Sequence, residues 1–392
     1  MNEAFNGKAA AGSRLHAVDF LRGVAILAVI WHHASSLVVY PPTVVPEIFR
    51  WVPWLRGGWF GVNLFFILSG FVLYLPYAQS RRHMAGWEDA SAFTRHRASR
   101  LLPLYYCGTA LLVVFNFWPN SASEAMTQVL SLATLTFGFS TATFFPKPNW
   151  VLWSLAVEVW FTAFFVLLTV AMRWYPRVPL AIAVLLVSLF VRWVGTVWAA
   201  ADIPGHQLNP VRDSVLGRLD DFFVGMLLAA WYAWRPTNAV LGAGRRLILI
   251  AGGMALATLA PLLWELNAVG IMPAKWPVIF ANNAIQVGTA MVLVAMLSKP
   301  ATAPRPYVVL GVELLGMMCY SLYVWHGVVM ARVMPSLNLS GALLYVVALL
   351  AVSALSYRYI EFGRVRSWRQ LVPDLPPRNR AGAVFAKSKS KD

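Results

Sequence analysis

The sequence predicts an all-α fold, a polytopic transmembrane helical bundle, on two observations. First, 59% of the 392 residues are hydrophobic and only 12% are charged, well below the roughly 25% of charged residues in soluble domains. Second, the hydrophobic residues come in blocks of about 20, the length that a helix needs to cross a hydrocarbon core of about 30 Å. Such a chain cannot hide its apolar surface in one aqueous core, so we expect lipid to surround it.

Ten apolar blocks are long enough to be transmembrane helices, and an eleventh stretch is not expected to cross. The ten blocks cover residues 18–40, 58–78, 101–118, 150–172, 178–200, 216–234, 247–265, 278–298, 311–332 and 341–360. The stretch 126–145 contains several Ser and Thr residues and is followed by two prolines, so we expect it to be interfacial or re-entrant on the outer side. We therefore expect a cytoplasmic N-terminal segment at 1–17, a transmembrane domain at 18–366 and a basic, disordered cytoplasmic tail at 367–392.

The net charge of +16 comes from short Lys and Arg clusters between the apolar blocks. These clusters fall in alternate connections and in the tail, which matches the preference of basic residues for the cytoplasmic side. We therefore expect both termini to be cytoplasmic, and we expect no nucleic-acid partner. The two cysteines, Cys107 and Cys319, lie inside apolar blocks, so neither a disulfide nor a metal site is expected. Residues 1–13 do not have the pattern of a removable signal peptide.

The first apolar block contains charged and titratable residues, which are costly at membrane depth and usually mark a site or a pair. They are Asp19, Arg22 and two adjacent histidines, His32 and His33. At 100° per residue, His33 returns to within about 20° of Arg22, whereas His32 ends about 80° away. Asp19, Arg22 and His33 should thus share one helix face, with Arg22 near the cytoplasmic end and His33 in the outer half. We expect His33 to be the catalyst and His32 to make helix contacts.

The fourth apolar block places a carboxylate at a depth similar to that of His33. Trp153, Ser154 and Glu158 lie in its first half, and Ser154 is one helical turn from Glu158 on the same face. Glu158 could orient the imidazole of His33, or it could tie two helices together.

Other charged or titratable residues lie in later blocks and admit two interpretations. For His326 and Arg192, packing or an ion pair between helices is as good an explanation as function. Arg218, Asp220 and Asp221 could bind a polar acceptor, but an ion network fits them better.

Six short motifs resemble one known family and occur in the same order along nearly the whole apolar chain. They are residues 19–23 (DFLRG) with His33, 57–71 (GGWFGVNLFFILSGF), 97–103 (RASRLLP), 153–155 (WSL) with Glu158, 320–323 (YSLY) with His326, and 357–361 (YRYIE). With these motifs, the chain resembles the acyltransferase-3 family of bacterial inner-membrane O-acyltransferases.

The resemblance implies transfer of an acyl group, with acetyl as the expected group, from cytoplasmic acyl-CoA to a hydroxyl presented outside. Arg22, Arg97 and Arg100 would bind the phosphates of acyl-CoA, which is a co-substrate and not a permanently bound cofactor. Arg97 and Arg100 could equally be topology signals in a basic loop. His33 would act as general base or carry the acyl group transiently, and Glu158 and Arg22 complete the expected catalytic set.

The expected acceptor is a saccharide or glycolipid, and the bilayer of the bacterial inner membrane is the expected environment. Asp19, Ser154, Trp153 and His326 are the residues that we expect to bind substrate. Two features depart from the family pattern: no soluble esterase-like domain is expected after the membrane part, and two adjacent histidines stand where one is typical. The alternative function is a flippase or exporter of lipid-linked sugars without catalysis, which would use the same charges as a polar pathway.

Overall fold

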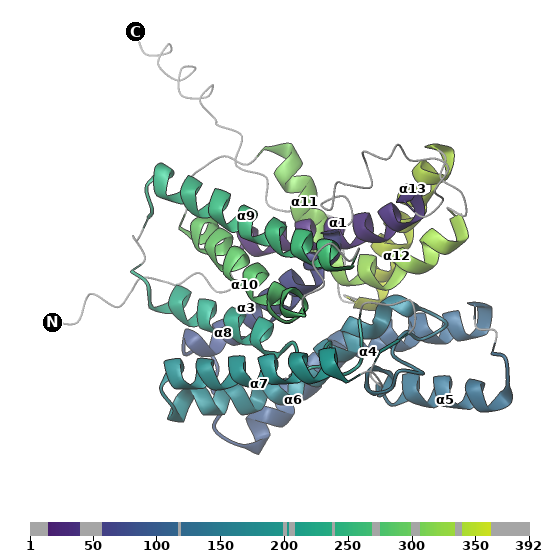
Figure 1. Cartoon of the computed structure of the whole chain (residues 1–392), viewed down its shortest axis with the longest axis horizontal. Coiled ribbons are helices and arrows are strands. Elements are labelled where there is room, and N and C mark those ends of the chain that lie inside the picture. Colours follow the sequence, from purple (N-terminus) through teal and green to yellow (C-terminus); the bar gives the residue numbers. More distant parts are fainter. Residues whose placement is uncertain are drawn as a thin grey trace, which may run out of the picture.

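The computed structural model describes residues 15–39, 57–116, 119–198, 202–203, 208–236, 240–268, 275–298, 306–333 and 339–361. All regular elements in these ranges are helical (Figure 1). They are α1 (His16–Val39), η2 (Gly57–Trp59), α3 (Phe60–Ala78), α4 (Trp87–Asn116), α5 (Ala122–Ala133), η3 (Phe137–Phe139), η4 (Trp150–Leu152), α6 (Trp153–Trp174), α7 (Arg177–Val197), α8 (Leu219–Trp234), α9 (Ala243–Ala268), α10 (Trp276–Leu297), α11 (Tyr307–Met317), α12 (Cys319–Val333), α13 (Leu339–Ser356) and η6 (Tyr357–Glu361). The all-α prediction is confirmed, whereas the tail at 367–392 and most of the segment at 1–17 lie outside the described residues.

Eight helices in the described part of the chain are long and apolar enough to cross a membrane, two fewer than predicted. The predicted span at 311–332 is broken into α11 and α12, which are bent by 80°, and counting this pair as one span gives nine. The predicted span at 216–234 contains only the 16 residues of α8, about 24 Å of helix, because residues 210–218 before it form turns. The stretch 126–145 contains the end of α5, which has 12 residues and is too short to span.

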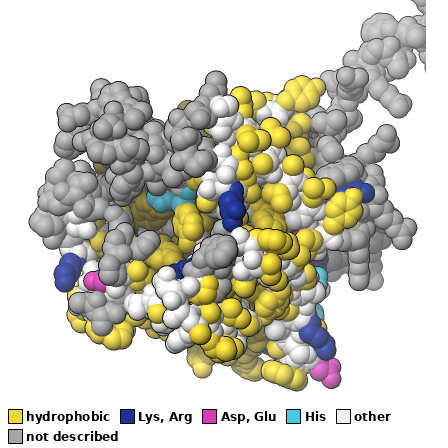
Figure 2. Space-filling view, turned by 90° about the vertical axis from the view of Figure 1, so that its right-hand side faces the viewer, with side chains coloured by type: hydrophobic (Ala, Val, Ile, Leu, Met, Phe, Trp, Pro, Cys, Tyr) yellow, Lys and Arg dark blue, Asp and Glu magenta, His cyan; other side chains and the backbone are white. Residues whose placement is uncertain are grey.

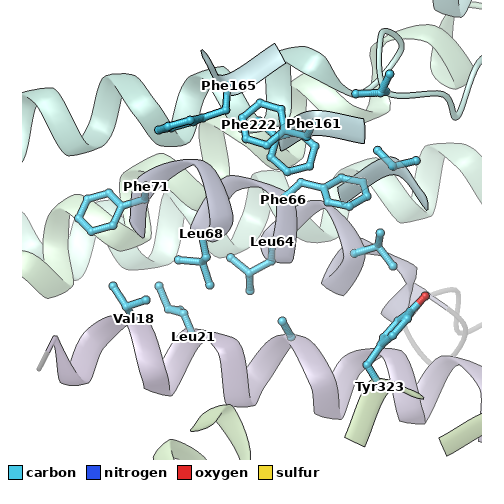
Figure 3. Close-up of a cluster of buried hydrophobic side chains, with 14 of the residues drawn as sticks. Val18, Leu21, Leu64, Phe66, Leu68, Phe71, Phe161, Phe165, Phe222 and Tyr323 are labelled. Atoms are coloured by element: carbon cyan, nitrogen blue, oxygen red, sulfur yellow. The ribbon is translucent and has the colours of Figure 1, made fainter. Parts of the chain in front are cut away.

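Helix α3 is the centre of the bundle. Of the residues in its most apolar segment 72% are buried, against 22–50% for the other seven spans. Figure 3 shows Phe66 of α3, Phe161 of α6 and Phe222 of α8 gathered in one aromatic cluster, in which the Phe161 and Phe222 rings stack with centroids 3.7 Å apart. Glycine allows α3 and α8 to approach closely, since a Cβ on Gly70 would lie 2.0 Å from the carbonyl oxygen of Phe222.

A buried ion network joins α7, α8 and the turn before α8. Arg192 donates to both carboxylate oxygens of Asp220, at 3.1 and 2.8 Å. Arg218 lies 2.5 Å from Asp213 and 3.9 Å from Asp221. Amides of neighbouring helices complete the network: Asn63, Asn282, Asn283 and Gln286. The network, not a site open to an acceptor, accounts for Arg218, Asp220 and Asp221.

The break between α11 and α12 changes the direction of the chain beside α1 (Figure 1). Helix α11 packs closely on the first half of α1, and glycine at position 316 allows this approach. A Cβ on Gly316 would lie 1.8 Å from the carbonyl oxygen of Asp19. Helix α12 then starts at Cys319 and passes α1 again, nearer its second half, where His33 meets His326. Interrupted helices at membrane depth are tolerated where they are buried in protein or line a cavity. The bend brings three side chains of α12, Cys319, Tyr320 and Tyr323, to a cavity wall.

The outer surface of the bundle suits contact with lipid. Figure 2 shows hydrophobic side chains over much of one face, and a hollow in this face with histidine side chains at its edge. Large apolar side chains are exposed on α7 and α13 in particular, such as Leu186, Phe190, Leu344 and Val347. Exposed apolar area of this extent in helices of this length is typical of a multi-pass membrane protein.

Candidate active site

A cavity of about 70 Å³ lies between α1, α3, α4, α6 and α12. Five residues singled out from the sequence line it: Arg22, Arg97, Arg100, Ser154 and Glu158. They come from three helices that are far apart in the sequence. The cavity is polar on one side and has room for several water-sized groups.

Arg97 and Glu158 form the firmest contact in this cavity. The Arg97 Nη2 atom donates to Glu158 Oε1 across 2.7 Å, and Arg97 is 7% exposed. Ser69 of α3 donates to the same carboxylate oxygen across 3.1 Å. A charge-assisted hydrogen bond of this length is among the stronger polar contacts in proteins. Arg97 and Glu158 therefore tie α4 to α6 and fix one wall of the cavity.

The lining carries an excess of positive charge. Among its residues, the three guanidinium groups of Arg22, Arg97 and Arg100 face one carboxylate, that of Glu158. A further carboxylate outside the lining, that of Glu361, interacts electrostatically with Arg100 and Arg22 and accepts a 2.9 Å hydrogen bond from Ser321. Arginine presents several N–H donors in one plane, which suits phosphate and carboxylate oxygens. The cavity is thus electrostatically suited to an anionic ligand.

His33 is oriented by a second histidine. Nδ1 of His326 lies 2.7 Å from the carbonyl oxygen of Tyr323, which can only accept, so Nδ1 carries the proton of the neutral His326 ring. Nε2 of His326 then accepts, and Nδ1–H of His33 donates to it across 2.9 Å. The lone pair of neutral His33 is consequently on Nε2. His326 is fully buried and His33 half-buried, so the pair has a fixed inner ring and an outer ring with more access to solvent.

Tyr323 connects the histidine pair with the cavity. Its ring lines the cavity, its backbone carbonyl accepts from His326, and its hydroxyl forms a 2.7 Å hydrogen bond with Ser154. The Tyr323 hydroxyl also donates to the carbonyl oxygen of Val151. The His33 ring also packs edge-on against the Trp150 ring, with ring centroids 4.5 Å apart. The two histidines are not part of the cavity lining, and Tyr323 lies between them and the arginines.

The expected contact between Glu158 and His33 is wrong. Within the described residues, the Glu158 side chain bonds Arg97 and Ser69, and the His33 side chain bonds His326. The predicted contact rests on the similar depth of the two residues in the membrane, and depth does not determine the lateral position of a helix.

Three other candidates have different surroundings. Asp19 lies on the α1 surface that packs against α11 and does not line the cavity. Trp153 is buried and stacks on Phe144, with ring centroids 5.7 Å apart. His32 is a tilted neighbour of His33, with ring centroids 5.2 Å apart.

Comparison with known proteins places the chain in a family. Residues 15–358 match the acyltransferase domain that defines the acyltransferase-3 family. The chain belongs to this family. The match includes every described helix from α1 to α13. The resemblance seen in the short motifs is thereby confirmed.

Curated relatives include proteins named for O-acetyl transfer. The chain is 24% identical over 370 residues to the peptidoglycan O-acetyltransferase OatA of Listeria monocytogenes, covering 88% of this chain and 54% of that protein. It is 25% identical over 366 residues to a Komagataeibacter xylinus protein named "Putative membrane-bound transacylase BcsY", covering 89% and 82%. A Staphylococcus aureus protein named "Putative O-acetyltransferase" is 22% identical over 361 residues, covering 88% and 56%. The chain thus spans about half the length of the first and third of these relatives. No solved structure matches it.

Several cavity residues of this acyltransferase-3 protein were not selected from the sequence. Ser69, Cys319, Tyr320 and Tyr323 line the cavity. Ser69 and Tyr323 lie inside the motifs at 57–71 and 320–323, which was a usable signal. Tyr323 is also three residues before His326, so the two side chains share a helix face. Cys319 gave no signal, because its place at the wall depends on the bend after Met317.

Proposed function

We propose that this chain is a membrane O-acyltransferase of the bacterial inner membrane that moves an acyl group, acetyl in the first instance, from acyl-CoA to a saccharide hydroxyl. The observation that carries the proposal is the hydrogen-bonded series from His33 through His326 to the Tyr323 carbonyl. This series leaves a basic nitrogen, Nε2 of His33, and its inner end, Tyr323, lines a cavity rich in arginine. Family membership and the names of the O-acetyltransferase relatives support the same reaction.

The donor would bind with its phosphates at the arginines. Arg22, Arg97 and Arg100 are the candidates, since all three line the cavity, and the Arg97 guanidinium also bonds Glu158. The cavity of about 70 Å³ is far smaller than a coenzyme A molecule, so donor binding requires it to widen. The pantetheine arm would run past Tyr323 and bring the thioester to His33.

In the proposed reaction, Nε2 of His33 takes the proton of the acceptor hydroxyl as its oxygen attacks the thioester carbonyl. The new C–O ester bond forms, the C–S bond breaks, and the thiolate of coenzyme A leaves with the proton from His33. The proton on Nδ1 of His33 stays bonded to His326 throughout, which holds the ring in the reactive tautomer. The acceptor class that we propose is a lipid-linked or cell-wall saccharide. The name of the Listeria relative, a peptidoglycan O-acetyltransferase, supports this class.

The test compares two neighbouring histidines on one helix. His33→Ala and His32→Ala are expressed at matched levels in a deletion strain, and O-acyl groups on cell-envelope glycans are measured by mass spectrometry. We expect acylation to fall roughly 10²–10⁴-fold in His33→Ala, the usual contribution of a general base, and to stay near wild type in His32→Ala. Undiminished acylation in His33→Ala would exclude the proposed base. Loss of glycan export with acylation intact would instead favour a transporter.

A further inference from the structure

A second, larger cavity lies at the C-terminal end of α8, whereas the aromatic cluster lies at its start, and it has no part in the proposed reaction. It has a volume of about 770 Å³, which falls in the range of small-molecule sites. Its walls are the start of α7, the end of α8, the residues before α9 and the end of α10. In Figure 1 the ends of α7 and α8 that border it lie on the left of the bundle. The residues that matter for its chemistry are Arg177, Leu227, Trp231, Trp234, Arg235 and Ser298.

Both arginines of this cavity are held by aromatic rings. The guanidinium carbon of Arg177 lies 3.8 Å from the centroid of the Trp234 ring, and that of Arg235 lies 4.4 Å from the Tyr232 ring. A guanidinium group that stacks through its face keeps its N–H donors at its edge available, because all five lie in its plane. Arg235 uses one of them on Ser298 Oγ at 3.4 Å, a long contact. The cavity therefore contains two oriented cations and one hydroxyl.

No carboxylate balances these cations within the described lining, which contains neither Asp nor Glu. The rest of the wall is apolar and includes Leu227 and the rings of Trp231 and Trp234, of which Trp234 is 70% exposed. A ligand that fits such a wall must carry an anionic group next to hydrocarbon. A free phosphate would satisfy the arginines but would leave the apolar wall in water.

The position of the cavity in the bundle agrees with this chemistry. It lies where α7 begins and where α8 and α10 end, the end of the bundle whose connections carry the basic clusters. Tryptophan is enriched at the membrane–water interface, and basic pockets between transmembrane helices at the cytoplasmic side suit lipid head groups. We propose that the Arg177–Arg235 cavity binds the phosphate head group of an anionic phospholipid, with the acyl chains lying along Trp231, Trp234 and Leu227. This proposal does not depend on acyl transfer.

The test titrates the purified full-length chain with phosphatidylglycerol and, separately, with phosphatidylcholine of the same acyl chains, and counts bound lipid by native mass spectrometry. Arg177→Gln and Arg235→Gln each remove one cavity cation. Arg173→Gln is the matched control, because Arg173 is at the same end of the bundle and stacks on Trp174 but does not line the cavity. We expect each cavity variant to weaken phosphatidylglycerol binding about fivefold, from about 1 kcal/mol per arginine, while the control binds as the wild type does.

Three outcomes would overturn the proposal. Equal weakening in Arg173→Gln would indicate a general surface-charge effect, and equal binding of phosphatidylcholine would remove the role of the anionic head group. The same affinity for inorganic phosphate or coenzyme A without lipid would assign a soluble ligand instead. Melting of each variant in a zwitterionic detergent shows whether it is folded. If a glutamine variant does not fold, Arg177→Lys and Arg235→Lys replace it, because they keep the positive charge. We expect the lysine variants to bind phosphatidylglycerol more weakly than the wild type. Lysine variants that bind it as tightly as the wild type would exclude a role for the N–H donors at the guanidinium edge.

Discussion

Two groups of charges inside this bundle are built on different principles: the first is buried, whereas Arg22, Arg100 and Glu158 of the second are half-buried. The network around α8 contains three arginines and three aspartates, Arg192, Arg212, Arg218, Asp213, Asp220 and Asp221, so its formal charge is zero. None of these six residues lines either cavity. The group at α1, α4 and α6 has three arginines and one glutamate in its lining and encloses a cavity. In this protein, charges around a cavity therefore mark the candidate site, whereas the paired charges of the α8 network do not.

The difference reflects the cost of burying ions. A buried charge must be paired and hydrogen-bonded, or the desolvation penalty makes the fold unstable. Around α8 each carboxylate has a guanidinium or amide partner inside the protein. At the cavity, Arg22, Arg100 and Glu158 are only half-buried and border space that water can enter, so their desolvation penalty is smaller. We expect mutations in the first group to change stability and mutations in the second to change activity.

The largest effect should come from the α8 network. Arg192→Met leaves the Asp220 carboxylate buried without its bidentate partner, and breaking a buried pair in this way costs about 3–5 kcal/mol of unfolding free energy. The measurement is thermal unfolding of the purified chain in detergent, monitored as the loss of monodisperse protein with rising temperature. The double variant Arg192→Met with Asp220→Leu should recover much of the loss, because it removes both charges. If Arg192→Met is as stable as the wild type, the α8 network does not stabilise the fold as we expect.

A smaller and different effect is expected at the histidine pair. His326→Ala removes the acceptor of the His33 Nδ1–H group, so kcat should fall by about 10-fold to 100-fold as the ring loses its fixed tautomer. His326→Gln retains an acceptor and should restore part of kcat. Donor KM should change little in either variant. Equal loss in both variants, with equal loss of thermal stability, would mean that His326 acts through packing alone.

The smallest effect is expected at the cavity mouth. Arg100→Gln should raise KM for acetyl-CoA about tenfold, the value of one charge-assisted hydrogen bond, with kcat nearly unchanged. The assay uses membrane vesicles that contain matched amounts of each variant. Arg95→Gln is the control, since Arg95 is on the same helix but exposed and outside the cavity lining. A KM that rises equally in both variants would show that the loop charge, not the cavity, attracts the donor.

Much of the helical architecture could be predicted from the sequence because hydropathy and helix periodicity are local properties. The membrane-spanning character and the family follow from apolar blocks and short motifs. The common face of Arg22 and His33 follows from 3.6 residues per turn in an unbroken helix, α1. The structure places Arg22 in the cavity lining and His33 beside His326, outside that lining.

The remaining features depend on contacts between distant segments. The 80° bend has no signal in hydropathy, because residues on both sides of Met318 are apolar, and it accompanies the close packing of Gly316 on α1. The partner of Glu158 could not be predicted from its depth, since depth gives the position along the membrane normal only. Which helix lies beside Glu158 in the membrane plane decides its partner, and that partner is Arg97 of α4. The short α8 reflects the turns at 210–218 that carry Arg212, Asp213 and Arg218 into the ion network.

The interrupted helix has a mechanical consequence for the first one. The segment Tyr307–Val333 contacts both halves of α1: Gly316 packs on Asp19 in the first half, and His326 bonds His33 in the second. Rotation of α1 about its own axis would therefore disturb the contact of Gly316 with Asp19 or the hydrogen bond of His326 with His33. Because Arg22 and His33 belong to this one helix, about 16 Å apart along its axis, a shift of α1 along that axis would move both side chains together.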